Sequence, residues 1–364
     1  MFEFLRIKRF KTLLDASFPL ANLNLFSGLN GMGKSSLIQV LLILRQSQER
    51  NVLASRGLLL RGDYVSLGVG QDVLSCEAEV NSLEFTLKWK DREAVVFPFD
   101  YAAASDLQPL AQDAHIPELS GYSLFNGNFQ YLCADRIGPR AQYDVSDFTL
   151  HELNSLGIHG EYAIQYIAEN ALRPLSVPAL QRAETPTFLQ NLDAWMSELS
   201  PGIRIKASMQ AQAATLGYAF VHGKDVTADF KPQNVGFGLT YSLPVVTSLL
   251  RARPGDLLII ENPESHLHPA GQSMVARLCA LVAAHGVQLM IESHSDHFLN
   301  GLRVAVKEGE LSPDQVSVFF LERPYTADKH ASIVRNPRID AQGCLDSWPE
   351  GFFDESDKAL ERLL

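Results

Sequence analysis

A glycine-rich segment near the amino terminus has the residue types and spacing of a phosphate-binding loop. Residues 28–35 read GLNGMGKS, which fits the pattern G-x-x-x-x-G-K-[ST] at every fixed position. An apolar run at 23–26 precedes the loop, and an apolar segment that favours a helix follows it as far as about residue 45. A strand, this loop and a helix in that order are the context in which the pattern binds the phosphates of a nucleotide.

Each residue type in this loop has a chemical task. The glycines let the backbone approach a phosphate closely, and the amide groups at the start of the helix carry about half a positive charge. We expect Lys34 to reach the β- and γ-phosphates and to be catalytic, and the Ser35 hydroxyl to ligate Mg²⁺. The expected nucleotide contacts of this segment are Gly28, Asn30, Gly31, Gly33, Lys34, Ser35 and Ser36.

Two apolar strands that end in ionisable side chains are expected to complete the site. The run at 257–260 ends in Glu261, a carboxylate that can hold Mg²⁺ through water at the carboxyl end of a strand. The run at 287–291 continues into Glu292, Ser293 and His294, and we expect His294 to contact the γ-phosphate. A glutamate after a buried strand is common, so the prediction that Glu261 and His294 are catalytic rests on the two patterns together.

A third glycine turn, NVGFGLT at 234–240, opens an apolar helix that runs to about residue 250. The start of such a helix can hold the γ-phosphate of a nucleotide on a facing subunit through backbone amides and a hydroxyl. We therefore expect Gly236 and Gly238 to contact nucleotide across a dimer interface. A tight turn needed only for packing is the alternative.

Taken in order, these motifs resemble those of bacterial ABC-type ATPases akin to the OLD, RecF and SMC proteins. The final segment resembles the C-terminal box of one subfamily of these ATPases. The resemblance implies a homodimer closed around ATP and Mg²⁺, and it adds Lys11 to the nucleotide contacts. The segments are I-x-x-F-K at 7–11, the phosphate loop, N-V-G-F-G at 234–238, E-N-P-E-x-H-L-H-P at 261–269, E-S-H-S-D-H at 292–297 and W-P-x-G-F-F-D at 348–354.

The sequence departs from that family at the position where ABC ATPases carry their catalytic glutamate. Asn262 follows the Mg²⁺-binding Glu261, and an amide cannot accept a proton. Water activation is then either weak or supplied by Glu264 or His294. The family also places a glutamine-containing loop near residues 130–140, and Gln130, Arg136 and Arg140 are alternatives for its contact with nucleotide.

Two further chemistries are less favoured. OLD nucleases carry a C-terminal metal-binding module, whereas 70 residues follow His294 here, which are too few for it. His266 and His268 with His294 and His297 have spacing compatible with a metal cluster, but the resemblance accounts for all four without zinc.

Composition indicates the cellular compartment of the protein and the kinds of partner that are disfavoured. The net charge of −11 disfavours tight DNA binding by this chain alone, since a DNA-binding surface is basic. No apolar run reaches the roughly 18 residues of a membrane span, and the amino terminus lacks the features of a signal peptide. Four cysteines without a C-x-x-C pair fit a reducing compartment. We therefore expect a cytoplasmic protein that does not enter a membrane.

The elements that must position these residues alternate between strands and helices, which predicts a mainly parallel sheet. Two short strands are expected within 1–26, short strands over 56–135, helices over 150–200 and a strand pair over 202–221. The expected fold class is α/β, a P-loop NTPase of ABC type with a mixed, mainly parallel sheet, an antiparallel β subdomain and a helical insertion. The expected domains are an N-terminal ATPase lobe (1–149), an insertion (150–230) and a C-terminal lobe (231–364).

These observations predict a switch that hydrolyses ATP, slowly because of Asn262. Two subunits close around two ATP molecules and thereby regulate a partner. The resemblance suggests an effector encoded nearby and a role in phage defence. A RecF-like repair ATPase that binds DNA directly and a scaffold that binds ATP without hydrolysis are the alternatives.

Overall fold

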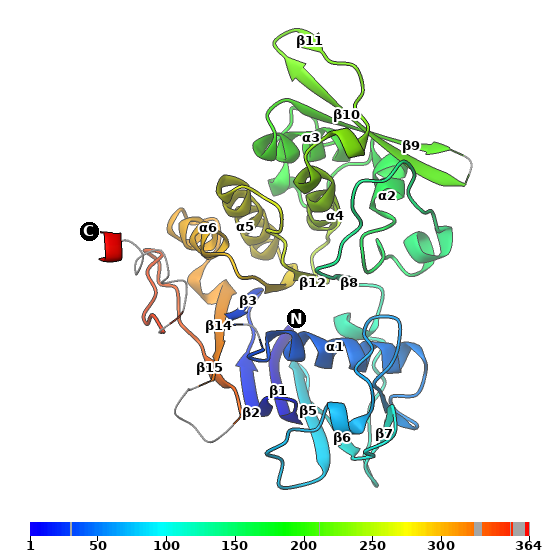
Figure 1. Ribbon diagram of the computed structural model, residues 1–364, viewed down its shortest axis with the longest axis vertical. Helices are drawn as coiled ribbons and strands as arrows, with labels where there is room; N and C mark the ends of the chain where they lie inside the picture. Colours follow the sequence, from blue (N-terminus) through cyan, green and yellow to red (C-terminus); the bar gives the residue numbers. More distant parts are fainter. Residues whose placement is uncertain (30, 211, 324–329, 350, 352–360, 364) are drawn as a thin grey trace. The chain divides into compact units, whose positions relative to one another are not determined.

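The structure, a computed structural model, describes residues 1–29, 31–210, 212–323, 330–349, 351 and 361–363 (Figure 1). The chain forms two compact units. The first contains residues 1–126, 316–338 and 345–364, and the second contains 127–315 and 339–344. These divisions differ from the expected boundaries at 149 and 230, because the strand that begins at Val316 belongs with the amino-terminal residues.

An antiparallel sheet forms one layer of the first unit. Its inward-facing apolar side chains alternate along the strands, as in Leu83, Phe85 and Leu87, all fully buried. Two strands were expected before the phosphate loop, and the structure has three, because residues 13–19 pair back on the first strand. The strands lie in the order β2-β1-β5-β6, with bounds β1 Phe2–Phe10, β2 Leu13–Pro19, β5 Ser82–Trp89 and β6 Val95–Asp100.

The strand before the phosphate loop lies in a second layer of the first unit. β3 (Leu23–Gly28) pairs in parallel with β14 (Val316–Glu322), and β15 (Ile333–Arg335) pairs antiparallel with β14. α1 (Lys34–Glu49) follows the loop and extends about one turn beyond the expected end. A short antiparallel pair, β4 (Gly57–Leu59) and β7 (Leu107–Pro109), completes the strands of this unit.

Three parallel strands in the order β13-β12-β8 form the centre of the second unit, and three long helices accompany them (Figure 1). Residues 257–260 are almost fully buried, as a strand covered on both faces requires. The α/β fold with a mixed, mainly parallel sheet and a separate antiparallel sheet is thus confirmed. The bounds are β8 Phe129–Leu132, β12 Leu257–Glu261, β13 Gln288–Glu292, α4 Phe237–Arg251, α5 Pro269–Ala284 and α6 Asp296–Lys307.

The region 150–200 was expected to be mainly helical, and it contains two helices with long irregular segments around them. α2 (Ala163–Asn170) and α3 (Phe188–Leu199) are separated by 17 residues without a long element. The expected strand pair is confirmed as the antiparallel β9 (Ile203–Gln210) and β10 (Ala213–His222), and the short β11 (Asp225–Val226) extends it.

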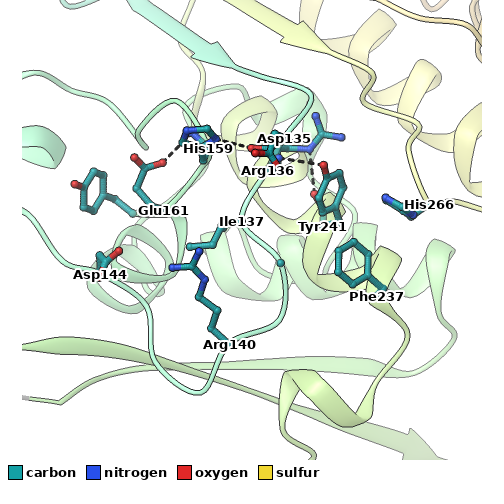
Figure 2. A pocket seen from close by; sticks show the side chains of 12 residues that line it. Asp135, Arg136, Ile137, Arg140, Asp144, His159, Glu161, Phe237, Tyr241 and His266 are labelled. Carbon is teal, nitrogen blue, oxygen red and sulfur yellow. Dashed lines mark hydrogen bonds between the residues drawn. The ribbon is translucent and has the colours of Figure 1, made fainter. Parts of the chain in front are cut away.

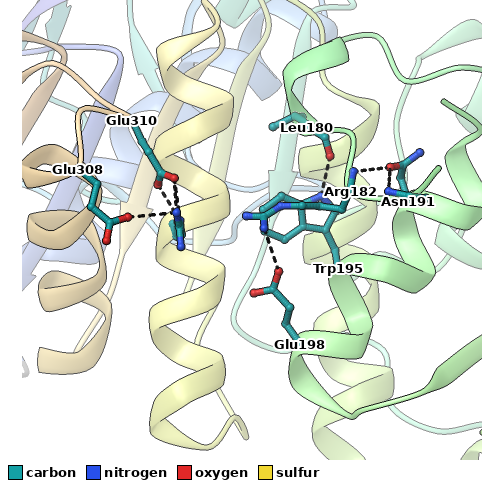
Figure 3. Close-up of polar contacts among 9 residues, drawn as sticks. Leu180, Arg182, Asn191, Trp195, Glu198, Glu308 and Glu310 are labelled. Carbon is teal, nitrogen blue, oxygen red and sulfur yellow. Dashed lines mark hydrogen bonds and ion pairs between the residues drawn. The ribbon is translucent and has the colours of Figure 1, made fainter. Parts of the chain in front are cut away.

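Side-chain contacts from α3 hold the irregular segment between the two helices (Figure 3). The Trp195 indole donates to the Leu180 carbonyl at 2.9 Å, and the Arg182 guanidinium lies 4.3 Å from the Trp195 ring centroid. The Asn191 side chain accepts hydrogen bonds from the amides of Arg182 and Ala183. Polar groups of the segment are satisfied in this way without regular structure, which is why helical spacing of apolar residues alone overestimated the helix content.

Candidate nucleotide site

The phosphate loop occupies the expected junction between β3 and α1 in the first unit. Gly28 ends β3 with φ 139°, and a Cβ atom there would lie 2.2 Å from the Leu321 carbonyl oxygen of β14. Gly33 has φ 94°, and a Cβ atom there would lie 2.7 Å from the Thr12 hydroxyl. Both positions therefore require glycine for backbone conformation and for space.

Lys34 folds back over its own loop. Its side chain is only 4% exposed, and the ammonium donates to the carbonyl oxygens of Gly28 at 2.8 Å and Leu29 at 2.9 Å. An ammonium held there can donate to phosphate oxygens that enter the loop. Ser35 is exposed in the first turn of α1, Ser36 is buried, Gly31 is exposed, and Asn30 lies outside the described residues.

The surroundings of the loop fit a polyanionic ligand with its metal. The residue before α1 is Gly33, which has no side chain to cap the helix, and no acidic residue lies in the first turn, so this helix start suits an anion. The buried hydroxyl oxygens of Thr12 and Ser332 have no hydrogen-bond partner among the described residues, and both lie beside Gly33. A triphosphate and Mg²⁺ would suit this set of donors, with the Ser35 hydroxyl as a hard oxygen ligand.

Lys11, which the resemblance added to the site, lies beside the phosphate-loop helix. Its ammonium donates to the Gln39 side chain of α1 at 2.7 Å. Burial lowers the pKa of Lys11, and the charge of Asp72 partly offsets that effect. The structure thus places Lys11 at α1, within the first unit.

In the second unit, Glu261 ends β12 as expected, and two donors orient its carboxylate. The Tyr131 hydroxyl donates to Glu261 Oε1 at 2.9 Å, and the Ala134 amide donates to Oε2 at 3.1 Å. Burial and the nearby Glu261 charge raise the pKa of Tyr131, so the phenol stays protonated and remains a donor. Each carboxylate oxygen keeps further acceptor capacity, which a metal-bound water would use.

A buried arginine that the sequence left as one of three alternatives fixes the chain after β12. Arg136 is 3% exposed, and its guanidinium donates to the carbonyl oxygens of Glu261 at 2.6 Å and Asn262 at 2.7 Å. It also lies 4.7 Å from the centroid of the Tyr241 ring in α4. Burial lowers its pKa. The hydrogen bonds of the Arg136 side chain therefore go to backbone carbonyl oxygens, and they link α4 to the acidic end of β12.

The other two alternatives differ sharply from each other. Gln130 is buried, and its amide donates to the Gly157 carbonyl at 3.0 Å and accepts from the Leu156 amide at 2.8 Å. Arg140 is exposed, and within the described ranges its guanidinium makes no hydrogen bond or ion pair. Of the three, Arg140 is the one whose side chain is available to a ligand.

Arg140 lines a cavity of about 680 Å³ at the start of α4, wholly within the second unit. Figure 2 shows the rings of Phe237, Tyr241 and His266 on one side of this cavity and the carboxylates of Asp144 and Glu161 on the other. The cavity therefore brings together residues from the loop after β8, the first turns of α4 and the loop after β12. No single motif in the sequence indicated it.

The two glycines of the turn before α4 differ in surroundings. A Cβ atom at Gly236 would meet nothing within 4 Å, whereas one at Gly238 would lie 2.3 Å from the His266 carbonyl oxygen. The nearby Thr240 hydroxyl is buried against the Tyr218 hydroxyl at 3.0 Å. A side chain at Gly238 would therefore collide with the backbone, as the packing alternative requires, whereas Gly236 has open space around it.

Asn262 has a conformational reason to be asparagine. Its φ of 44° lies in the left-handed region, which asparagine tolerates better than most residues. Its amide donates to the Glu292 carbonyl at 2.8 Å, which ties the turn after β12 to the end of β13. A glutamate at this position would carry a conformational cost that asparagine largely avoids.

Glu264 and His294 lie in contact. The buried Glu264 carboxylate accepts a hydrogen bond from the His294 amide at 3.1 Å, and the His294 side chain is exposed. Ser295 then caps α6, since its hydroxyl accepts from the Phe298 amide at 3.0 Å. The structure therefore brings Glu261, Asn262, Glu264 and His294 together on the turns after β12 and β13.

The four histidines considered as a metal cluster do not form one. Within the residues that the structure describes, the single group of His, Cys, Asp and Glu able to share a metal is Asp147, His151 and Glu169, which are all exposed. His268 instead caps α5, and His266 packs edge-on against Phe237 and Tyr241.

Comparison with known proteins matches two families to parts of the chain. Residues 150–300 match the family described as "AAA domain, putative AbiEii toxin, Type IV TA system". Residues 311–363 match a family described as a protein of unknown function (DUF3696), and this range includes the box at 348–354. No curated protein sequence is significantly similar to the chain. None of the helices within the described ranges is both long and apolar enough to cross a membrane.

Solved structures similar to this one include three SMC heads. An SMC head bound to the C-winged helix domain of ScpA matches with a TM-score of 0.50 at 14% identity, covering 92% of this chain and 97% of that one. The SMC head domain from Thermotoga maritima matches at 0.46 and 11%, covering 92% and 98%. The SMC head with an extended coiled coil, bound to the C-terminal domain of ScpA and derived from Pyrococcus furiosus, matches at 0.49 and 14%, covering 100% and 99%. By the match with a TM-score of 0.50, the chain has the fold of an SMC head, a P-loop ATPase fold of the ABC kind, and residues 150–300 of it match a AAA domain.

Proposed function

We propose that this protein is an ATPase switch that closes as a homodimer around two ATP molecules and thereby regulates a partner protein in the cytoplasm. The observation that carries the proposal is the phosphate loop, in which Lys34 is buried against two carbonyl oxygens of its own loop and a glycine precedes α1. An ammonium beside a helix amino terminus forms an anion site that suits the phosphates of a nucleoside triphosphate.

The proposal gives each residue a task. Lys34 and Ser35 bind the triphosphate and its Mg²⁺, Glu261 accepts from a metal-bound water, and His294 contacts the γ-phosphate. Mg²⁺ would neutralise the phosphate charge that develops during hydrolysis. The Gly236 turn and Arg140 of a second copy would approach the same nucleotide. The open space around Gly236 and the uncommitted Arg140 guanidinium support that part of the proposal.

Regulation of a partner is supported by what the matched proteins are said to do. The description of the AAA family names a putative AbiEii toxin of a type IV TA system, and the SMC head with a TM-score of 0.50 is described as bound to the C-winged helix domain of ScpA. A toxin-like effector encoded nearby, acting in phage defence, is the form of regulation that we propose for this chain.

A scaffold that binds ATP with little hydrolysis is the second candidate, because Asn262 cannot act as a base. Direct binding to DNA, as in a RecF-like repair ATPase, has less support because the net charge is −11. A DNA affinity of the isolated protein that falls steeply with salt would favour that third reading.

Lys34→Ala tests the proposal. Loss of one charged donor to a transition state commonly costs about 3–4 kcal/mol, so turnover should fall by roughly 10²–10³-fold. Lys224→Ala is the matched control, since Lys224 is an exposed lysine in a hairpin turn of the second unit. Phosphate release should fall by that factor in the first variant and be unaffected in the second. Equal turnover in the two variants would overturn the proposal.

A further inference from the structure

Glu264 is a carboxylate whose surroundings differ from those of a catalytic base. Its side chain is 7% exposed, and Oε1 accepts the hydrogen bond from the His294 amide at 3.1 Å. Oε2 is buried and has no hydrogen-bond partner within the described ranges. Burial raises the pKa of Glu264, whereas the hydrogen bond from the His294 amide and the charge of Arg136 act in the opposite direction.

The Glu264 carboxylate is shielded from solvent. With its side chain 7% exposed and Oε2 buried, it offers little access to a water molecule in the nucleotide site. A general base must come within hydrogen-bond reach of the water whose proton it accepts. The His294 side chain is exposed at this point, whereas the Glu264 side chain is buried.

The His294 backbone is held from both sides. Glu264 binds its amide, and Ser295, the next residue, caps α6 and donates to the Gln272 side chain at 2.5 Å. A separate bond from the Asn262 amide to the Glu292 carbonyl joins the same two turns. Because that second link remains when Glu264 is changed, loss of the carboxylate should loosen His294 without unfolding the turn.

We propose that Glu264 is a positioning residue that holds His294 in place for the γ-phosphate and that it does not accept the proton of the attacking water. This inference rests on the proposed ATPase function. Because Glu264 lies on the turn after β12, a movement of this turn would also move His294, the residue proposed to contact the γ-phosphate.

Two substitutions of similar size separate the two roles. Glu264→Gln keeps a carbonyl oxygen that can accept from the His294 amide, and Glu264→Met fills the same space without an acceptor. If Glu264 positions His294, kcat for ATP should stay within about 3-fold of wild type in Glu264→Gln and fall by roughly 10–100-fold in Glu264→Met, with KM little changed. A general base would instead lose about 10²–10⁴-fold in both variants.

Asp193 provides the matched control. It is a buried carboxylate on α3 that accepts a hydrogen bond from the Ile205 amide at 2.8 Å, outside the proposed site. Asp193→Asn and Asp193→Met repeat the two chemical changes, and thermal unfolding of all four variants shows whether they are folded. Both Asp193 variants should hydrolyse ATP at the wild-type rate.

The outcomes separate failure of this inference from failure of the function. Wild-type turnover no faster than that of Lys34→Ala would overturn the ATPase proposal itself. With that difference established, a loss of 10²-fold or more in Glu264→Gln would overturn the inference and make Glu264 the base. Wild-type turnover in folded Glu264→Met would also overturn it, because the hydrogen bond to His294 would then have no effect on hydrolysis.

Discussion

Asn262 is the position where a single substitution should change stability and chemistry in opposite directions. Its φ is 44°, and both of its backbone polar groups are used: the amide bonds to Glu292, and the carbonyl accepts from Arg136. Glutamine or glutamate would keep these two bonds but would have to adopt the left-handed conformation. That conformation costs such residues roughly 1–2 kcal/mol, of which asparagine avoids a part.

We therefore expect Asn262→Gln and Asn262→Glu each to lower the free energy of unfolding by about 1 kcal/mol. For a unit of this size, that change corresponds to a fall in melting temperature of roughly 2–4 °C. Asn262→Gly should show no such loss, because glycine adopts positive φ freely. Differential scanning calorimetry of the three variants measures this directly.

Turnover should separate the two destabilised variants. They share the same strain and nearly the same shape, and only glutamate can accept a proton. If wild-type hydrolysis is slow because position 262 lacks a base, Asn262→Glu should exceed Asn262→Gln by at least about 10-fold in single-turnover phosphate release, towards the 10²–10⁴-fold worth of a general base.

Equal turnover in the glutamine and glutamate variants would refute the argument that the missing base limits the rate. Unchanged melting temperatures in both variants would refute the conformational part, since they would show that position 262 imposes no preference for asparagine.

The remaining predictions concern the second unit. Arg136→Gln should lower the melting temperature, because several carbonyl oxygens lose a charged donor, whereas Arg140→Gln should leave it unchanged and lower ATP turnover. In denaturant unfolding, Gly238→Ala should cost about 1–3 kcal/mol through overpacking against a backbone carbonyl, and Gly236→Ala should cost nothing measurable. Burial raises the pKa of Asp193 from 3.8 to about 6, although the hydrogen bond from the Ile205 amide and the charge of Arg204 act to lower it. The folded state thus keeps this proton where the unfolded state has lost it, so the contribution of Asp193 to the free energy of unfolding should fall as pH rises from about 4 to about 6. Urea unfolding of Asp193→Asn should lack that part of the pH dependence.

The sequence was sufficient for the parts of the fold that depend on local patterns. The phosphate loop was predictable because its glycines, Lys34 and Ser35 act through the backbone that they themselves form. The buried strands before Glu261 and His294 were predictable because a short apolar run followed by polar residues has few other structures. The order of these elements then indicated an ABC-type fold.

Features set by distant contacts could not be predicted in this way. Arg136 binds carbonyls about 125 residues further along the chain, and no local pattern encodes which of two nearby arginines turns inward. Gly236 and Gly238 look equivalent in the sequence, and only the His266 carbonyl distinguishes them. The direction of the Glu264 side chain after Pro263 was likewise open, because a proline fixes one backbone angle and leaves the following side chain undetermined.

The central claim, that each ATP is shared between two copies of the chain, can be tested by mixing two inactive variants. Lys34→Ala removes the phosphate-loop ammonium. Gly236→Glu adds a carboxylate at the open start of α4, where it would repel a partner's γ-phosphate without harming the helix, because acidic groups are favourable at a helix amino terminus. Gly127→Glu is the control for the added charge, since a Cβ atom there also meets nothing within 4 Å.

Each variant alone should be inactive, and Gly127→Glu should be active. In a mixed dimer, the intact phosphate loop of the Gly236→Glu copy meets the intact turn of the Lys34→Ala copy, so one of the two sites is complete. An equimolar mixture should therefore recover about a quarter of wild-type turnover, because half of the dimers are mixed and each of these has one working site. No recovery in a mixture shown to contain mixed dimers would contradict the claim and place the turn and the loop at the same nucleotide within one chain.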